Sequence, residues 1–281
     1  MLIFSNILQI QNHLTKLKSE GNIIGFVPTM GALHDGHLSL IKKSISENDS
    51  TVVSIFVNPT QFDDSNDLLT YPKDIEKDIA LIKSISENTV LFKPDSYEIY
   101  SGEIKSDEFN LNGLDKYMEG ECRGNHFQGV ATVVNKLLSI VKSDHVYFGE
   151  KDFQQLRIIE NLVLDQKFDT KVVRCKTVRS SDGLALSSRN KKLSFSSAKI
   201  ATNLFKALNF AKEKFNTLDV IEIEKKVIEQ LSAHSEIQVE YFAIADEETL
   251  EPLLIKKNKK YRAFIAAYVS GVRLIDNKKL Y

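Results

Sequence analysis

Cysteine is scarce in this sequence, with only Cys122 and Cys175 among 281 residues. Two isolated thiols without paired spacing argue against a disulfide framework and against a zinc site, so we expect both to be reduced. An excess of charge of either sign is also lacking, since 37 Lys and Arg face 38 Asp and Glu and leave a net charge of −1. The composition therefore gives no electrostatic reason for binding nucleic acid or an anionic membrane.

Long hydrophobic runs are absent as well. No apolar stretch approaches the ~18 residues that a membrane helix needs, and residues 1–11 lack the basic region and apolar core of a signal peptide. We therefore expect no membrane association and a cytoplasmic location.

What the chain does contain, over residues 1–176, is an alternation of short β-branched runs with amphipathic helical stretches. The first two predicted strands begin about 30 residues apart, which is the length of a βαβ unit. This pattern predicts the α/β class and a Rossmann-like doubly wound parallel sheet. The predicted strands are 23–27, 51–57, 89–92, 145–148 and 171–175, and the predicted helices are 37–45, 75–85, 130–141 and 153–164.

A second, smaller domain is expected over residues 177–281. With 31.8 kDa and 42% hydrophobic residues the chain has enough apolar surface for two cores. Near residue 177 the pattern becomes rich in turns and includes Asp182-Gly183, a hairpin dipeptide. The basic run at 256–260 is expected to be a solvated turn between strands. This α+β domain has predicted helices at 197–215 and 218–233 and predicted strands at 238–245, 261–269 and 271–275.

The turn after the first predicted strand, Pro-Thr-Met-Gly-Ala-Leu-His-Asp-Gly-His at 28–37, has the composition of a phosphate site. Gly31 and Gly36 allow positive φ or a close approach to a ligand, and the free N–H groups at a helix start favour an anion. His34 and His37 lie three residues apart and can point the same way, each able to donate to developing phosphate charge. The turn therefore suits a nucleoside triphosphate; a glycine-rich turn with two surface histidines is the alternative.

Polar motifs also follow other predicted strands, and ligands of doubly wound folds bind beyond the carboxyl ends of the strands. Gln61 lies in Asn-Pro-Thr-Gln-Phe at 58–62 and offers an amide donor and acceptor. Lys151 lies in Gly-Glu-Lys-Asp at 149–152, and Arg189 ends the Ser-Ser-Arg run after the hairpin; both cations suit phosphate oxygens. Each motif alone also fits a surface turn, but their joint occurrence favours one shared pocket.

Two further features remain open at this level. Arg123 and His126 lie in a polar loop before a predicted helix, where they either touch substrate or hold the loop. Asp74 and Asp78 lie four residues apart on one helix face, which is typical either of solvated carboxylates or of a ligand to phosphate-bound Mg²⁺. Asp78 is the predicted magnesium ligand.

Taken in order from residue 23 to residue 190, these motifs resemble the pantoate–β-alanine ligase family, within the nucleotidyl-transferase superfamily that shares a His-x-Gly-His turn. The resemblance implies ATP-dependent condensation of (R)-pantoate with β-alanine to pantothenate through pantoyl adenylate, with release of pyrophosphate and AMP. It also implies a homodimer, and Mg²⁺ that enters with ATP. One departure is Arg-Gly-Asn-His-Phe at 123–127, where the family usually has Arg-Pro-Gly-His-Phe; we expect a more mobile loop.

The resemblance also implies roles for individual residues. His37 is the proton donor to the leaving pyrophosphate, while His34, Lys151 and Arg189 contact and stabilise the phosphates. Gln61 and Gln155 hold pantoate, and Gln61 also lies near β-alanine. The C-terminal domain is expected to close as a lid. The predicted ATP-binding residues are Met30, Gly31, Ala32, Leu33, His34, Asp35, Gly36, His37, Gly149, Glu150, Lys151, Asp152, Val178, Leu186, Ser187, Ser188 and Arg189.

Three other functions compete with this one. An adenylyltransferase acting on a phosphate-bearing substrate would need a further basic cluster, whereas the neutral amides of Gln61 and Gln155 favour a small organic acid. A tRNA-charging enzyme would need a basic surface or an anticodon domain. A nucleotide sensor would tolerate the loss of His37, which this chain retains.

Overall fold

The computed structural model describes residues 1–63, 65–257 and 259–281. The chain forms two compact units. Unit 1 consists of Met1–Asp115, Arg123–Glu150 and Gln155–Lys176, and unit 2 of Lys116–Cys122, Lys151–Gln154 and Thr177–Tyr281. Two short segments before residue 177 thus belong to the second unit, although the sequence pattern places them in the first domain.

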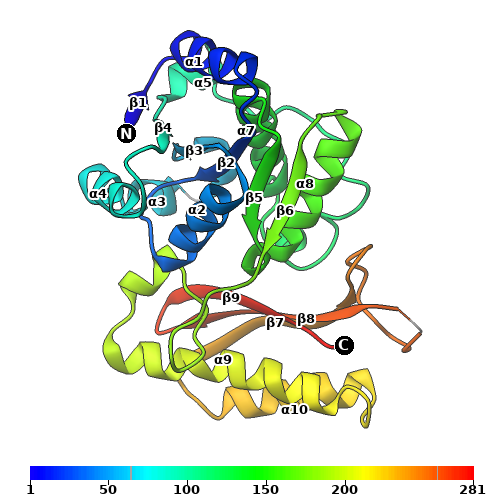
Figure 1. Ribbon diagram of the computed structural model, residues 1–281. Coiled ribbons are helices and arrows are strands. Elements are labelled where there is room, and N and C mark those ends of the chain that lie inside the picture. The colour runs from blue at the N-terminus through cyan, green and yellow to red at the C-terminus, as the bar shows by residue number, and fades with distance from the viewer. Residues whose placement is uncertain (64, 258) are drawn as a thin grey trace. The chain divides into compact units, whose positions relative to one another are not determined.

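Unit 1 is built on a six-stranded parallel sheet with the order β1-β4-β3-β2-β5-β6 (Figure 1). The doubly wound fold is confirmed. The order reverses between β2 and β5, because the chain passes from β2 to β3 and β4 on one side and returns through β5 and β6 on the other. Ligands bind at such a switch point. The strands are β1 (Leu2–Phe4), β2 (Ile24–Thr29), β3 (Ser50–Ile55), β4 (Val90–Phe92), β5 (His145–Gly149) and β6 (Lys171–Cys175).

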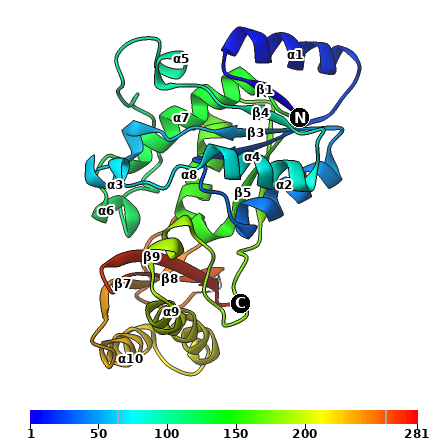
Figure 2. The same ribbon diagram turned by 90° about the vertical axis from the view of Figure 1, so that its left-hand side faces the viewer.

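Helices cover both faces of this sheet (Figure 2). α2 (Asp35–Glu47) packs beside α4 (Ile75–Ile85), and α1 (Ile7–Ser19) packs beside α7 (His126–Val141) on the opposite face. No helix among the described residues has the length and apolarity needed to cross a membrane. The remaining helices before residue 177 are α3 (Ser65–Leu69), α5 (Ser96–Tyr100), α6 (Glu119–Cys122) and α8 (Phe153–Asp165), with 3-10 turns η1 (Pro59–Gln61) and η2 (Glu150–Asp152).

Unit 2 is built on a three-stranded antiparallel sheet, β7 (Ile237–Asp246), β8 (Tyr261–Val269) and β9 (Val272–Lys279). Its apolar side packs on α9 (Phe195–Lys214) and α10 (Val220–Ser232). The smaller α+β unit is therefore confirmed.

A two-residue turn joins β8 to β9. Ser270 and Gly271 have φ of +49° and +80°, the two positive values that a type I′ hairpin turn requires. β9 continues beyond the predicted end at residue 275. Its last residues are polar in sequence, but Asp276 and Asn277 are buried, with exposed fractions of 5% and 4%.

The predicted hairpin around Asp182-Gly183 is present. Arg179 and Ala185 form an antiparallel bridge, and the Leu186 N–H donates to the Val178 carbonyl at 3.0 Å. Gly183 has a φ of +93°, a conformation that favours glycine.

The predicted solvated turn at 256–260 is wrong for Lys256, whose Nζ donates to the carbonyls of Phe215 and Leu218. Lys259 is exposed, and its Nζ lies 2.8 Å from Asp246 Oδ2. Asn258 of this run lies outside the described residues.

Candidate active site

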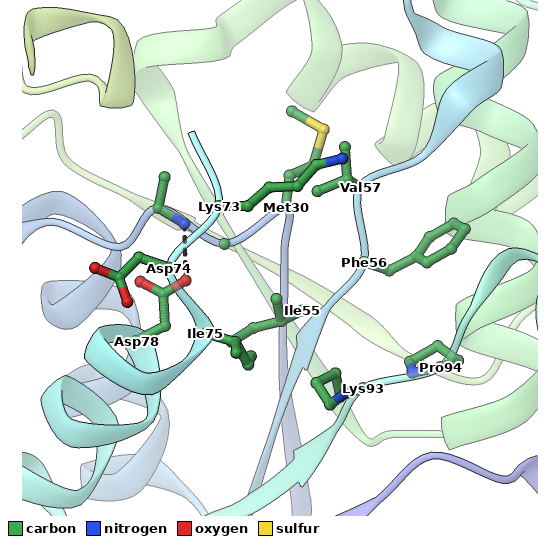
Figure 3. A pocket seen from close by; sticks show the side chains of 12 residues that line it. Met30, Ile55, Phe56, Val57, Lys73, Asp74, Ile75, Asp78, Lys93 and Pro94 are labelled. Carbon is green, nitrogen blue, oxygen red and sulfur yellow. Dashed lines mark hydrogen bonds between the residues drawn. The ribbon is translucent and has the colours of Figure 1, made fainter. Parts of the chain in front are cut away.

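A buried carboxylate holds the turn that follows β2. Asp78 on α4 has 2% of its surface exposed. Its Oδ2 accepts the Ala32 N–H at 2.8 Å (Figure 3), and its Oδ1 accepts the Leu33 N–H at 2.8 Å. Both carboxylate oxygens are therefore used in shaping the turn. Among the described residues no group of three or more metal-ligating side chains is found, and the predicted Mg²⁺ contact of Asp78 stays a prediction.

The same turn needs a glycine. Gly31 has a φ of +79°, and a Cβ built on it would lie 3.0 Å from Asp78 Oδ2 and 3.1 Å from Ile55 Cγ2. Its N–H donates to Thr29 Oγ1 at 3.1 Å, and the Thr29 hydroxyl donates to the Ser54 carbonyl at 2.8 Å. The backbone of the turn is thus fixed by side chains of β2 and α4.

His34 and His37 lie side by side at the start of α2, as their spacing predicts. Their ring centroids are 4.0 Å apart. His34 is the N-cap residue, and its Nδ1 accepts the Gly36 N–H at 3.1 Å. A nitrogen that accepts carries no proton, so the ring proton of His34 lies on Nε2. This nitrogen is therefore a hydrogen-bond donor, as the predicted phosphate contact of His34 requires.

Gln61, at the end of η1, has a fixed amide orientation. Its Oε1 accepts from Asn58 Nδ2 at 3.1 Å, and its Nε2 donates to Met30 Sδ at 3.0 Å. Asn58 is held in turn because the Tyr100 hydroxyl donates to its Oδ1. Burial raises the pKa of Tyr100 above its usual value, which keeps that hydroxyl a donor. Gln61 thus presents its N–H groups on the side of Met30.

Arg123 and His126, in the loop before α7, contact the backbone carbonyl of Gln61. The Gln61 carbonyl lies 2.7 Å from His126 Nδ1 and 3.5 Å from Arg123 Nη2. Arg123 Nη1 lies 3.0 Å from His126 Nε2. Since a guanidinium only donates, Nε2 accepts, and the proton on Nδ1 is donated to the Gln61 carbonyl. Of the two roles left open by the sequence, the geometry supports holding the chain in place.

This loop differs locally from the usual family sequence. Gly124 occupies the position where proline is common and has a φ of +39°. A proline ring fixes φ near −65°, so this backbone conformation requires a residue other than proline.

A cavity of about 180 Å³ opens beside the turn, beyond the ends of β3 and β4 (Figure 3). Met30 lines it together with Lys73 and Lys93, two lysines that the sequence analysis missed. Lys93 directly follows β4, so inspection of the residue after every strand would have found it. The Asp78 carboxylate lies at the same wall.

The remaining predicted ATP contacts are divided between the units. Gly149 and Glu150 belong to unit 1, where Gly149 ends β5 next to the switch point, and so does Gln155, which is predicted to bind pantoate. The others belong to unit 2, and they are Lys151, Asp152, Val178, Leu186, Ser187, Ser188 and Arg189.

Within unit 2 these residues have defined local contacts. Lys151 Nζ lies 3.1 Å from Asp152 Oδ1. Ser187 caps the 3-10 turn η3 (Ser188–Lys192), and its Oγ accepts the Arg189 N–H at 3.3 Å. Gln154 is buried and bonds to the backbone of Tyr117 and Glu119, so it holds that segment in place.

Comparison with known proteins decides the family. The model of the family described as Pantoate-beta-alanine ligase matches residues 2–279. The chain belongs to this family. It is 46% identical over 281 residues to the pantothenate synthetase of Flavobacterium psychrophilum, with 100% of each chain covered.

Solved structures agree along the whole chain. The crystal structure of pantothenate synthetase from Thermus thermophilus superposes with a TM-score of 0.92 at 39% identity, covering 100% of both chains. The pantoate-beta-alanine ligase of Francisella tularensis, described as complexed with beta-gamma ATP and beta-alanine, has a TM-score of 0.80 at 40% identity and covers 100% of this chain and 98% of its own.

Proposed function

We propose that this chain joins (R)-pantoate to β-alanine in an ATP-dependent reaction that passes through pantoyl adenylate. The observation that carries the proposal is the His34–His37 pair on a braced glycine turn in a chain that matches the ligase family over residues 2–279. In the first step the pantoate carboxylate attacks the α-phosphorus and pyrophosphate leaves. In the second the amine of β-alanine attacks the acyl carbon and AMP leaves, forming the amide of pantothenate.

Catalysis of the first step rests on positioning and on neutralising phosphate charge, since the protein supplies no nucleophile. The start of α2 and the Nε2–H of His34 receive the phosphates. His37 donates a proton to the leaving pyrophosphate, and Lys151 and Arg189 stabilise its charge. The other residues of the ATP set line the nucleotide; they are the rest of Met30 to Gly36 with Gly149, Glu150, Asp152, Val178, Leu186, Ser187 and Ser188.

The acid is held by neutral amides. The N–H groups of Gln61 face the side of Met30, and they suit a carboxylate or hydroxyl oxygen of pantoate. Gln155 completes the pantoate site, and Gln61 also meets the incoming β-alanine. A site of this kind selects a small hydroxy acid over a phosphate-bearing substrate, which would need a cation in the same place.

Further parts of the proposal concern what accompanies the substrates. Mg²⁺ enters bound to ATP and needs only one or two protein ligands, of which Asp78 is the candidate. The C-terminal unit acts as a lid that excludes water from the adenylate. The enzyme works as a homodimer and binds neither nucleic acid nor a membrane. It works in the cytoplasm, a reducing compartment in which its two free cysteines stay reduced.

The test omits one reactant at a time. AMP formation should require ATP, Mg²⁺, pantoate and β-alanine together, while ATP and pantoate without β-alanine should release pyrophosphate only to about one equivalent of enzyme. Sedimentation measures the oligomeric state in the same preparation. Pyrophosphate release that does not depend on pantoate would refute the proposal, and release driven by a phosphate-bearing substrate would favour a different adenylyltransferase.

A further inference from the structure

Asn277 on β9 connects the C-terminal sheet to the segment that carries Lys151. Its Nδ2 donates to the Lys151 carbonyl at 2.8 Å, and its Oδ1 accepts from Arg262 Nη1 at 2.5 Å. A guanidinium only donates and a carbonyl only accepts, so the two partners fix the orientation of the amide. The side chain is 4% exposed, and no other residue type of this size offers one donor and one acceptor in this geometry.

Arg262 packs against the same segment, the one that carries Lys151. It is 2% exposed, and its Cζ lies 3.8 Å from the ring centroid of Phe153, two residues after Lys151. Its Nε donates to Glu247 Oε1 at 2.8 Å, so the buried charge is paired. The segment that carries Lys151 therefore packs against Arg262, a buried side chain of unit 2 whose charge is neutralised by Glu247.

Asp276, the residue before Asn277 on β9, holds the hairpin that leads to Arg189. Asp276 accepts from Arg179 Nη1 at 2.5 Å and from Arg179 Nη2 at 2.8 Å, in a bidentate pair. Arg179 also donates to the Gly183 carbonyl at 3.1 Å and pairs with Ala185 across the hairpin. Ser187–Arg189 follow directly after the second strand of this hairpin.

We infer that Asp276 and Asn277 are positioning residues of the adenylation step, a role that rests on the proposed function. Neighbouring residues of a strand face opposite sides, so one dipeptide holds Lys151 through one side chain and the Ser187–Arg189 segment through the other. The covalent spacing of the dipeptide thereby fixes the spacing of two groups assigned to the phosphates. A misplacement of about 1 Å in such a group costs roughly 100-fold in rate.

The substitution Asn277→Asp tests this most sharply. It keeps the size and the Arg262 contact but replaces the donor to the Lys151 carbonyl with an oxygen. We expect the maximal rate of pantoate-dependent pyrophosphate release to fall by roughly 10- to 100-fold, with the KM for pantoate unchanged. The matched control is Asn203→Asp on α9, where the side chain bonds to Ile200 and Lys206 of its own helix; its rate should stay at the wild-type value.

A double-mutant cycle separates positioning from general destabilisation. If Asn277 acts through Lys151, then Asn277→Asp should change the rate of a Lys151→Ala enzyme by less than about 2-fold. An effect of equal size in both backgrounds, or a wild-type rate in the single variant, would overturn the inference.

A second variant guards against misfolding. If Asn277→Asp does not fold, Asn277→Ser removes both contacts without adding charge and takes its place, with thermal melting as the check. Failure of this inference is distinct from failure of the proposed function, because the latter appears as missing pantoate-dependent pyrophosphate release in the wild-type enzyme itself.

Discussion

The turn after β2 and the pair of segments around Lys151 and Arg189 are both assigned to the phosphates of ATP, yet they are held differently. The turn is braced within unit 1, by Thr29 beside it and by one carboxylate, Asp78 on α4, that accepts two backbone N–H groups. The segments of unit 2 are held by side chains of β9, about a hundred residues further along the chain. The first arrangement needs only β2 and α4 of unit 1, whereas the second depends on the folding of the sheet of unit 2.

The largest effect is expected when the proposed proton donor is removed while Thr29 and Asp78 still hold the turn. His37→Ala should slow adenylate formation by roughly 100- to 10,000-fold, because general acid catalysis is lost, while ATP affinity changes only slightly. Pre-steady-state pyrophosphate release and equilibrium ATP binding measure the two quantities. Equal losses in rate and in affinity would contradict the role of His37 as proton donor.

Removing the brace itself should cost stability as well as activity. Asp78→Ala leaves the buried N–H groups of Ala32 and Leu33 without their acceptor, and we expect the free energy of unfolding to fall by about 3 kcal/mol. Urea denaturation measures it. Asp74→Ala on the same helix is the matched control, since this exposed N-cap should cost only about 1 kcal/mol. Equal losses in the two variants would show that Asp78 is an ordinary helix residue.

A smaller effect is expected when the backbone carbonyl of Gln61 loses its hydrogen-bond donor. His126→Ala removes the donor to the Gln61 carbonyl and should raise the KM for pantoate by about 10-fold, the equivalent of about 1.4 kcal/mol. The neighbouring Asn125→Ala, whose side chain contacts Ser106 at 3.4 Å, should leave it unchanged. If the KM for ATP rises instead, the loop serves the nucleotide.

The smallest effect concerns stability at alkaline pH. Burial raises the pKa of the Cys175 thiol from 9.0 to about 11. Between these values the unfolded thiol ionises while the folded thiol keeps its proton, so stability is intact below pH 9 and declines as pH rises towards 11. Cys175→Ala should flatten this part of the profile of urea midpoint against pH. An unchanged slope would assign the decline to other groups, such as Tyr147, whose pKa burial raises to about 12.

Sequence patterns predicted the parallel sheet, which is confirmed, and they predicted candidate catalytic groups, because both have local signatures. Runs such as Val52–Val53 are buried and β-branched, and the histidines of the turn sit at a helix start. β1 was missed because it has three residues and an exposed pattern. The residues that hold these segments were harder to find: nothing near Asp78 in the sequence indicates the two N–H groups that it accepts, and Asn277 lies in a polar stretch typical of a solvated strand end. Their role depends on partners distant in sequence, which no local pattern encodes.

The short turn between β8 and β9 carries a consequence for tolerated chain length. One residue added to or deleted from Ser270-Gly271 would shift β9 by one position and exchange the sides that Asp276 and Asn277 face. After an insertion the Asp276 carboxylate would meet the Lys151 carbonyl, and after either change Arg179 would lose its bidentate partner. Loop grafting or length variation at this distant hairpin should therefore damage turnover even where the sheet still forms.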